Sequence, residues 1–292
     1  MKFKIYKNIS DCGRLWKKFS TDKKLFDIWE YRSCFYNRKD YSPYFIAAKD
    51  KGRIVGMLPL LYVKNDNNYT YFGDWFPERN TIFLKDKSNL PLLLEKCPAK
   101  TKLHGIDPAE KRYFNFKEDE YTYFLDLAKY NQSFDKFFTS FDKKKQKNFR
   151  QELKSVPKHK VYYNRLKDYN RLVELNIKQF DNESLFTEKP AAAAMKRLVM
   201  KAYRKRMLNM VSVQINGKVE AIDLGIRADG WYHVVTGGSN NHKIPNLGKL
   251  ITVLTIKNAI KKGTKIVDFL ATSGHWKSQW HFDKEMLLKY EN

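Results

Sequence analysis

The pattern of hydrophobic and polar positions is clearest in the second half of the chain. There, the hydrophobic runs Met210–Ile215 and Val219–Arg227 flank the turn Asn216-Gly217-Lys218. A short turn that contains Gly between two such runs is typical of a β-hairpin. The turn Asp229-Gly230 then leads into a third run, Trp231–Val235. The pattern therefore predicts an antiparallel meander of three strands.

The first half of the chain shows the same order of elements. The runs Tyr44–Ala48 and Ile54–Val63 flank a turn at Gly52, and a third run follows at Asn68–Phe72. Gly52 and Gly217 head equivalent hairpins close to 165 residues apart. Two meanders of one plan, each followed by a helix and another strand, indicate two copies of one α+β unit. The alternative is that the two meanders resemble each other only as any two antiparallel meanders do, without a duplication.

The loop after the third strand of the second meander is a candidate donor site. Pro245–Lys249 leads into a predicted helix, Leu250–Lys262, and then a strand, Lys265–Leu270. Free backbone N–H groups at a helix N-terminus, together with the helix dipole, favour pyrophosphate. The segment suggests an enzyme that holds a phosphate-bearing acyl donor, although most such loops are ordinary crossovers. The expected donor-binding residues are Asn246, Leu247, Gly248 and Lys249, with Gly237 and Gly238 at the end of the preceding strand.

The composition is that of a globular protein with a large positive charge. Of the 292 residues, 42% are hydrophobic, which is enough for a large core or two medium domains. The net charge of +24 attracts polyanions at low salt, and the basic run Lys143–Arg150 offers a place for an anionic substrate or tRNA. Only 13 of the 56 basic residues are Arg, so an AT-rich genome also explains the excess of Lys.

The expected compartment is the cytoplasm. The longest hydrophobic runs are too short to cross a bilayer, so no stable membrane insertion is expected. The charged, alternating stretch Met1–Tyr6 lacks the hydrophobic core of a signal peptide. Cys12, Cys34 and Cys97 are scattered, without a CxxC pair or a His at ligand spacing. This pattern favours reduced thiols over disulfides or a metal site.

Several motifs in a fixed order resemble those of a known family, the GNAT-fold acyltransferases of the BioF2-like or CelD-like type, which are related to the FemAB peptidyltransferases. The motifs are Val55–Leu60, Leu125-Asp126-Leu127, Lys143–Arg150, Asn216–Ala221, Pro245–Leu250, Asp268-Phe269-Leu270 and Trp276-Lys277 with Trp280. The resemblance implies an α+β fold of tandem GNAT-like units, each a mixed, mostly antiparallel sheet flanked by helices. It implies an N-terminal unit over residues 1–130 and a C-terminal unit over residues 131–292 that carries the donor-binding loop.

The resemblance also implies a donor and a mode of catalysis. The donor is acyl-CoA, such as acetyl-CoA, and no metal is needed. Gly248 is the only Gly in Pro245–Lys249, whereas the ordinary acetyl-CoA signature has more small residues for close approach of the backbone to pyrophosphate. Gly237-Gly238 is consistent with the bulge that splays the preceding strand and frees amides for the acyl carbonyl, although a simple turn explains it equally well.

Three residues are candidates for catalysis. Asp223 lies mid-strand among hydrophobic residues, where a carboxylate needs a partner or a function. His233 lies on the neighbouring strand, and a histidine can serve as a base near neutral pH. Lys277 occupies, by resemblance, the position where FemAB-like enzymes keep a basic residue near the transferred group. Each residue also has a non-catalytic interpretation: Asp223 as a structural carboxylate, His233 as a core histidine and Lys277 as a surface lysine.

The acceptor is expected to contact an aromatic, charged loop of the first half. Asp74, Trp75 and Arg79 are its candidate residues, with Trp276 of the C-terminal segment. Three functions remain open. The first is transfer of an acyl group to a small-molecule or cell-envelope precursor amine, the second a FemAB-type transfer from aminoacyl-tRNA, and the third non-catalytic binding of nucleic acid. For the third function, the sequence shows no recognisable RNA-binding motif, zinc finger or helix-turn-helix.

Overall fold

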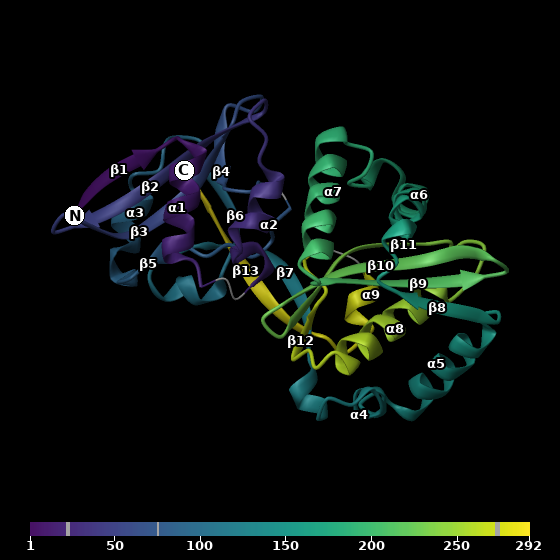
Figure 1. The fold of residues 1–292 in the computed structure, drawn as a ribbon. Coiled ribbons are helices and arrows are strands. Elements are labelled where there is room, and N and C mark those ends of the chain that lie inside the picture. The colour runs from purple at the N-terminus through teal and green to yellow at the C-terminus, as the bar shows by residue number, and fades with distance from the viewer. Residues whose placement is uncertain (22–23, 75, 272–274) are drawn as a thin grey trace. The chain divides into compact units, whose positions relative to one another are not determined.

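The computed structural model describes residues 1–21, 24–74, 76–271 and 275–292 and divides into two compact units (Figure 1). The first unit comprises Met1–Thr122, Ala271–Ser273 and Lys284–Asn292. The second comprises Tyr123–Leu270 and Gly274–Asp283. The change from the first unit to the second falls within strand β7, and nearly all of the last strand belongs to the first unit. The division of the chain into copies at residue 130 stays a prediction.

The second unit is built on a sheet with the strand order β7-β12-β11-β10-β9-β8. Strands β8 to β11 form an antiparallel meander, whereas β12 pairs with β11 in parallel. Asn216 and Gly217, and again Asp229 and Gly230, have positive φ, which two-residue hairpin turns require. The strands are β7 (Lys117–Asp126), β8 (His159–Tyr163), β9 (Leu208–Ile215), β10 (Lys218–Ala228), β11 (Trp231–Ser239) and β12 (Ile266–Asp268).

Helices cover both faces of strands β8 to β11, with α6 and α7 on one side and α8 on the other (Figure 1). Helix α8 packs its hydrophobic residues against β9, including Val211 and Val213. It begins three residues before the predicted start at Leu250. The helices of this unit are α4 (Phe134–Thr139), α5 (Lys143–Ser155), α6 (Tyr169–Phe180), α7 (Lys189–Arg204), α8 (Leu247–Lys261) and α9 (His275–Ser278).

The first unit holds an antiparallel sheet in the order β1-β2-β3-β4, with β5 paired to β3. Trp16 is fully buried at the centre of its aromatic core. The C-terminal strand β13 pairs with β6. The elements of this unit are β1 (Lys2–Tyr6), α1 (Ile9–Phe19), α2 (Trp29–Arg32), β2 (Tyr41–Asp50), β3 (Arg53–Val63), β4 (Asn68–Tyr71), β5 (Phe83–Leu84), α3 (Leu90–Leu94), β6 (Lys102–Ile106) and β13 (Asp283–Glu291).

The two units share one plan, which confirms the predicted α+β fold class. Each has a strand, two helices, a three-stranded meander, a helix and a further strand, as in β8-α6-α7-β9-β10-β11-α8-β12. The hairpin turn at Lys51 and Gly52 has φ of 45° and 79°, and the turn at Asn216 and Gly217 has φ of 49° and 78°. A parallel bridge between β4 and residue 101 corresponds to the parallel pairing of β11 with β12.

Candidate functional site

Strands β11 and β12 diverge within the sheet of the second unit. Their parallel pairing covers three residue pairs and ends where His233 lies opposite Asp268. Strand β12 stops there, whereas β11 continues to Ser239, still paired with β10 on its other edge. We call the point of divergence, at His233 and Asp268, the strand fork. The last part of β11 has a neighbouring strand on one edge only within the described residues.

A β-bulge lies in β11 directly beyond the strand fork. The ladder between β10 and β11 skips Val235. A bulge takes backbone groups out of the ladder and changes the direction of the strand. The sequence suggests this irregularity at Gly237 and Gly238, but both of these residues pair regularly with β10. The bulge therefore precedes the glycines by two residues.

Asp223 stands on β10 opposite Gly237 of β11. Its Oδ2 atom accepts a 2.9 Å hydrogen bond from Oγ1 of Thr255 on α8. Its Oδ1 atom occupies the space that a Cβ atom on residue 237 would need. Burial raises the pKa of Asp223 from its ordinary value of 3.8 to about 6, and the bond from Thr255 opposes this rise. A buried carboxyl with its pKa raised in this way is a candidate acid–base group.

His233 is buried at the strand fork and pairs with Asp268 rather than with Asp223. Its Nδ1 atom lies 3.1 Å from Oδ2 of Asp268, which is also buried, and its ring stacks on Trp231. The ladder places His233 opposite Ile226, an odd number of residues from Asp223 along β10. The two side chains therefore point to opposite faces of the sheet. The structure does not bring Asp223 and His233 together as one acid–base pair.

Lys277 is buried in the short helix α9, so the alternative of a surface lysine does not hold. Its Nζ atom donates to the carbonyl oxygens of Phe269, at 2.8 Å, and Leu270, at 3.0 Å. Leu270 has a φ of 62°, so the chain turns sharply after β12. The ring of Tyr123 lies 5.7 Å from the ammonium group. Trp276 is 42% exposed and meets the ring of Phe269 edge-on.

The predicted donor loop leads into α8 through Asn246, whose φ of 65° is left-handed. Two of the amides expected to hold pyrophosphate have acceptors within the protein. The Leu247 N–H donates to the Ile244 carbonyl at 3.4 Å, and the Gly248 N–H donates to Oδ1 of Asn241 at 3.1 Å. A phosphate at this helix N-terminus would therefore replace the Asn241 side chain.

Helix α5 holds the same loop from its other side. The ammonium group of Lys249 forms an ion pair with Glu152 and lies over the ring of Phe149. The Asn246 side chain donates a 3.2 Å hydrogen bond to Oγ of Ser155. Lys249 thus has a carboxylate partner in this structure, and a phosphate would compete with Glu152 for it.

The candidate acceptor residues of the first unit make hydrogen bonds within that unit. Asp74 accepts a 2.9 Å hydrogen bond from the Tyr41 hydroxyl, and burial raises its pKa. Arg79 is buried and pairs with Glu285 at 2.9 Å. Trp75 lies outside the described residues. The acceptor role of these residues stays a prediction.

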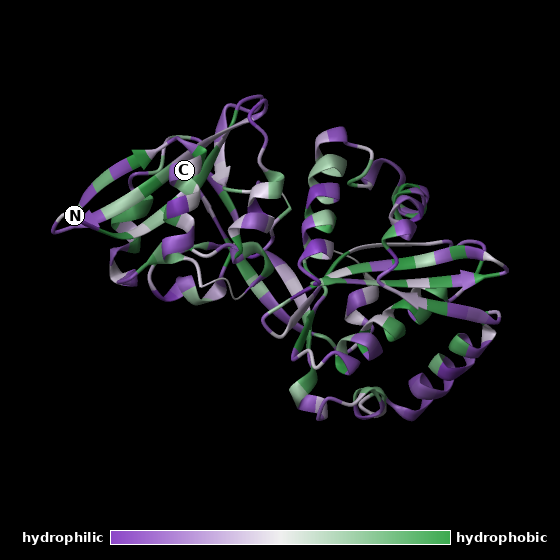
Figure 2. Cartoon of the chain, viewed as in Figure 1, coloured by the Kyte–Doolittle hydropathy of each residue, from purple (hydrophilic) through white to green (hydrophobic). Residues whose placement is uncertain are grey.

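Four cations form a stripe along α5. Lys143, Lys147, Arg150 and Lys154 are spaced by four, three and four residues, which places them on one face of the helix, and all four are exposed. No salt bridge involves them within the part of the chain that the structure describes. Figure 2 shows that α5 is mostly hydrophilic. We call this set the α5 stripe.

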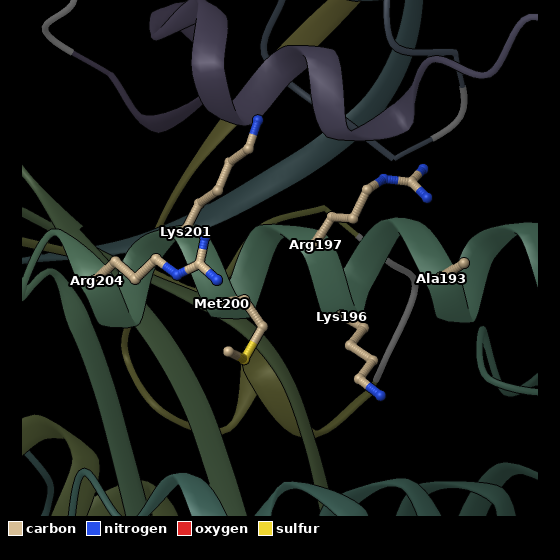
Figure 3. Close-up of a pocket in the computed structure, with 6 residues that line it drawn as sticks. All are labelled: Ala193, Lys196, Arg197, Met200, Lys201 and Arg204. Atoms are coloured by element: carbon tan, nitrogen blue, oxygen red, sulfur yellow. The ribbon is translucent and has the colours of Figure 1, made fainter.

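A second basic feature is a groove of about 430 Å³ on α7 (Figure 3). Arg197 and Lys201 leave the helix on one side, and Lys196 and Met200 leave it on the other. Arg204 and Ala193 complete the lining. All six residues come from one helix, so the groove is shallow and lacks the convergent polar groups of a built ligand site.

The described residues contain no group of His, Cys, Asp and Glu side chains arranged to hold a metal ion. None of their helices has the length and apolar character that crossing a membrane requires.

Sequence reasoning misses two residues that define the site. Thr255 fixes the Asp223 carboxyl, and Asn241 caps α8 from seven residues away. A signal for Thr255 exists, because it is a polar residue on a helix that is buried nearly all round. No local pattern identifies Asn241, since its contact depends on how the loop folds back.

Residues 143–278 match the family model described as the acetyltransferase (GNAT) domain.

Among solved structures, the chain is similar to FemX, with 13% identity, a TM-score of 0.59, and 99% of this chain and 96% of that chain covered. It is similar to a tandem GNAT protein from the clavulanic acid biosynthesis pathway, solved without AcCoA, with 11% identity, a TM-score of 0.55 and coverage of 99% and 98%. It is also similar to L-PGS from Bacillus licheniformis, with 9% identity, a TM-score of 0.58 and coverage of 95% and 90%. No curated protein matches the chain. At these identities the structural matches show the tandem GNAT fold.

Proposed function

Residues 143–278 belong to the GNAT acetyltransferase domain family, and from this premise we propose that the chain is an N-acyltransferase that uses a CoA thioester. The acceptor is an amine on a small molecule or a cell-envelope precursor. The donor is acetyl-CoA or a similar acyl-CoA, in keeping with the AcCoA named for the tandem GNAT protein of similar fold. We place the reaction in the cytoplasm.

The observation that carries this proposal is the position of Asp223. A carboxyl with a pKa of about 6 stands beside the backbone of β11, two residues beyond its bulge. A general base works best when its pKa lies near the working pH. Backbone amides next to a bulge are oriented groups that stabilise a developing oxyanion. A base and oxyanion donors on adjacent strands are what transfer of an acyl group to an amine needs.

In the proposed reaction, the amine nitrogen attacks the carbonyl carbon of the thioester and the carbonyl electrons move to oxygen. Asp223 takes the proton that the amine loses. The tetrahedral intermediate then collapses, the carbon–sulfur bond breaks and the thiolate leaves, to be protonated in turn. Lys277 adds a buried positive charge near the transferred group, held by the carbonyl oxygens of Phe269 and Leu270. A fixed charge of this kind stabilises the oxyanion or the thiolate without reorganisation.

The donor phosphates are proposed to bind at the N-terminus of α8. Lys249 and the amides of residues 247 and 248 are the groups involved, and binding replaces Asn241 and Glu152 as their partners. Loss of these protein contacts is offset by charge-assisted hydrogen bonds to phosphate. Donor binding therefore includes a rearrangement of the Asn241 side chain.

The test is release of free thiol from acetyl-CoA and longer acyl-CoAs in the presence of a panel of amines. We expect Asp223→Asn to lower kcat by roughly 100-fold, the usual size of a general-base contribution. Asp229→Asn is the matched control, because Asp229 lies in a hairpin turn and loses the same charge. Full activity of Asp223→Asn would refute the assignment. Mass spectrometry of ligands that co-purify with the protein would identify the acceptor class.

A second candidate function is transfer from aminoacyl-tRNA, which the α5 stripe favours. The stripe lies on the helix that contacts the donor loop, and it presents cations over about 16 Å, at 1.5 Å per residue. That length suits an extended polyanion better than the compact phosphates of CoA. The whole-chain similarity to FemX is in keeping with this candidate. Steeply salt-dependent binding of tRNA, with no thiol release from any acyl-CoA, would favour it over the first.

A further inference from the structure

We infer that His233 and Asp268 are positioning residues that hold the ammonium group of Lys277 in place for acyl transfer. This inference rests on the proposed function, in which Lys277 stands near the transferred group. The pair itself has no contact with a reacting atom in this scheme. It acts through the turn that follows β12.

A continuous path of hydrogen bonds joins the pair to Lys277. Nδ1 of His233 lies 3.1 Å from Oδ2 of Asp268. Oδ1 of Asp268 accepts a 2.9 Å bond from the Leu270 N–H, and the Leu270 carbonyl accepts a 3.0 Å bond from Lys277. The Phe269 carbonyl, in the same turn, accepts a second bond from Lys277 at 2.8 Å. One carboxylate therefore ties β11 to the turn that carries both acceptors of the ammonium group.

The position of Asp268 explains why the turn after β12 needs the hydrogen bond from the Leu270 N–H to the Asp268 carboxylate. Asp268 is the last residue of β12 and the last to pair with β11, so the chain beyond it has no further ladder on the β11 side. On the other side, the Phe269 N–H donates to the Tyr123 carbonyl at 2.9 Å, and the Tyr123 N–H donates to the Leu270 carbonyl at 3.2 Å. Leu270 adopts a left-handed φ of 62°, which costs energy for a residue with a Cβ atom. The bond from its N–H to a buried carboxylate stabilises this conformation. Together with the backbone bonds to Tyr123, this bond sets the directions of the two carbonyl groups that hold Lys277.

Two substitutions of His233 separate this role from simple packing. The amide nitrogen of Asn matches the Nδ1 position, so His233→Asn keeps a donor toward Asp268. The amide of Gln reaches the Nε2 position instead, so His233→Gln fills more of the site but removes that donor. Asp268→Asn keeps the shape of the carboxylate and loses one of its two acceptors.

The first experiment measures the position of Lys277 without any assay of activity. Trace labelling with acetic anhydride, read by mass spectrometry on the folded protein, reports how accessible each amine is. We expect the labelling rate of Lys277 to rise roughly 10-fold in His233→Gln and Asp268→Asn, and to stay near the unmodified value in His233→Asn. Lys257, exposed on α8, is the internal control and should not change. Equal labelling of Lys277 in all the proteins would overturn the inference, and so would a His233→Asn protein in which Lys277 is labelled as fast as in His233→Gln.

The second experiment links the pair to the reaction. We expect His233→Gln to lower kcat roughly 30-fold with a KM for the donor within about 3-fold of the original. In a Lys277→Ala background the same substitution should have little further effect, because the group it positions is gone. Equal losses in both backgrounds would show that the pair does not act through Lys277. Absence of transfer in the unmodified protein would refute the proposed function and leave the labelling result standing.

Discussion

Oγ1 of Thr255 donates a 2.9 Å hydrogen bond to Oδ2 of Asp223, and this is the contact that fixes the candidate base. The bond joins the middle of α8 to the middle of β10, so the orientation of the carboxyl depends on the packing of the helix on the sheet. Burial raises the pKa of Asp223, and the Thr255 bond acts against burial. The pH dependence of the reaction should therefore respond to both residues.

The first prediction concerns the pH–rate profile. Because a base works only when deprotonated, kcat/KM should rise with pH through a midpoint of about 6 and then level off. Thr255→Val removes a hydrogen bond that favours the carboxylate, so the midpoint should move up by roughly 1 pH unit. The measurement is the rate of thiol release between pH 5 and pH 9. A midpoint that stays fixed in Thr255→Val would contradict the assignment of this limb to Asp223.

The second prediction concerns stability. Folding raises the pKa of Asp223 from 3.8 to about 6, so the stabilising contribution of its protonation is fully present below about pH 4 and lost as pH rises through 6. At neutral pH the ionised carboxyl costs at most about 3 kcal/mol. Asp223→Asn should therefore be more stable than the original protein by about 1 to 3 kcal/mol at pH 8. Urea unfolding at pH 4.5 and pH 8 tests this, since the difference should shrink at the lower pH.

The third prediction concerns Gly237. A methyl group at this position would collide with Oδ1 of Asp223 and approach the Ile222 carbonyl to 3.2 Å. Because a carboxylate is able to swing away, we expect Gly237→Ala to cost about 1 kcal/mol of stability but to lower kcat at least roughly 10-fold. In an Asp223→Ala background the stability cost should fall, since one of the two clashing partners is absent. An unchanged cost in the double variant would place the strain elsewhere in β11.

The sequence predicts the elements that depend on short-range pattern, and it fails where distant residues decide. The hairpin at Asn216 and Gly217 follows from turn chemistry, and the α+β class follows from the order of strands and helices. In contrast, the aromatic stretch 25–36 forms a short α-helix between two 3-10 turns, and the rings of Phe26 and Phe35 pack against each other and against the distant Phe76.

The candidate site shows the same limit. Asp223 is identifiable from its hydrophobic surroundings alone. Its partner Thr255 and the pairing of His233 with Asp268 depend on strand register and helix packing across about 30 residues of chain, from residue 223 to 255 and from 233 to 268. Burial of Lys277 is similarly a tertiary effect, set by two carbonyl groups of the turn after β12.

The fourth prediction separates stability from donor binding at Gly248. A Cβ atom here would have no neighbour closer than 3.7 Å, and Ala is the better helix former. Gly248→Ala should therefore raise stability by about 0.5 to 1 kcal/mol. The same methyl group would stand between the backbone amide and a bound phosphate, so the KM for acetyl-CoA should rise roughly 10-fold. A variant that is more stable and keeps its KM would show that the phosphates bind elsewhere.

The last prediction decides between the two donors through the α5 stripe. Lys143→Gln, Lys147→Gln and Lys154→Gln together remove three exposed charges and keep Arg150, whose guanidinium packs over the ring of Phe138. The matched control removes three exposed lysines of the first unit, at residues 51, 85 and 102, so both variants have the same net charge.

If tRNA binds along the stripe, each lost phosphate contact reduces the magnitude of the slope of log affinity against log salt by about 0.7 to 0.9. The slope of the stripe variant should therefore be smaller in magnitude by about 2 to 3. The slope of the control variant should equal that of the original protein. If the donor is acetyl-CoA, the KM of both variants should stay within about 2-fold of the original, because a compact ligand at the N-terminus of α8 does not reach along α5. Equal loss of tRNA affinity in both variants would assign that binding to the overall charge of +24 and reject the α5 stripe as a tRNA site.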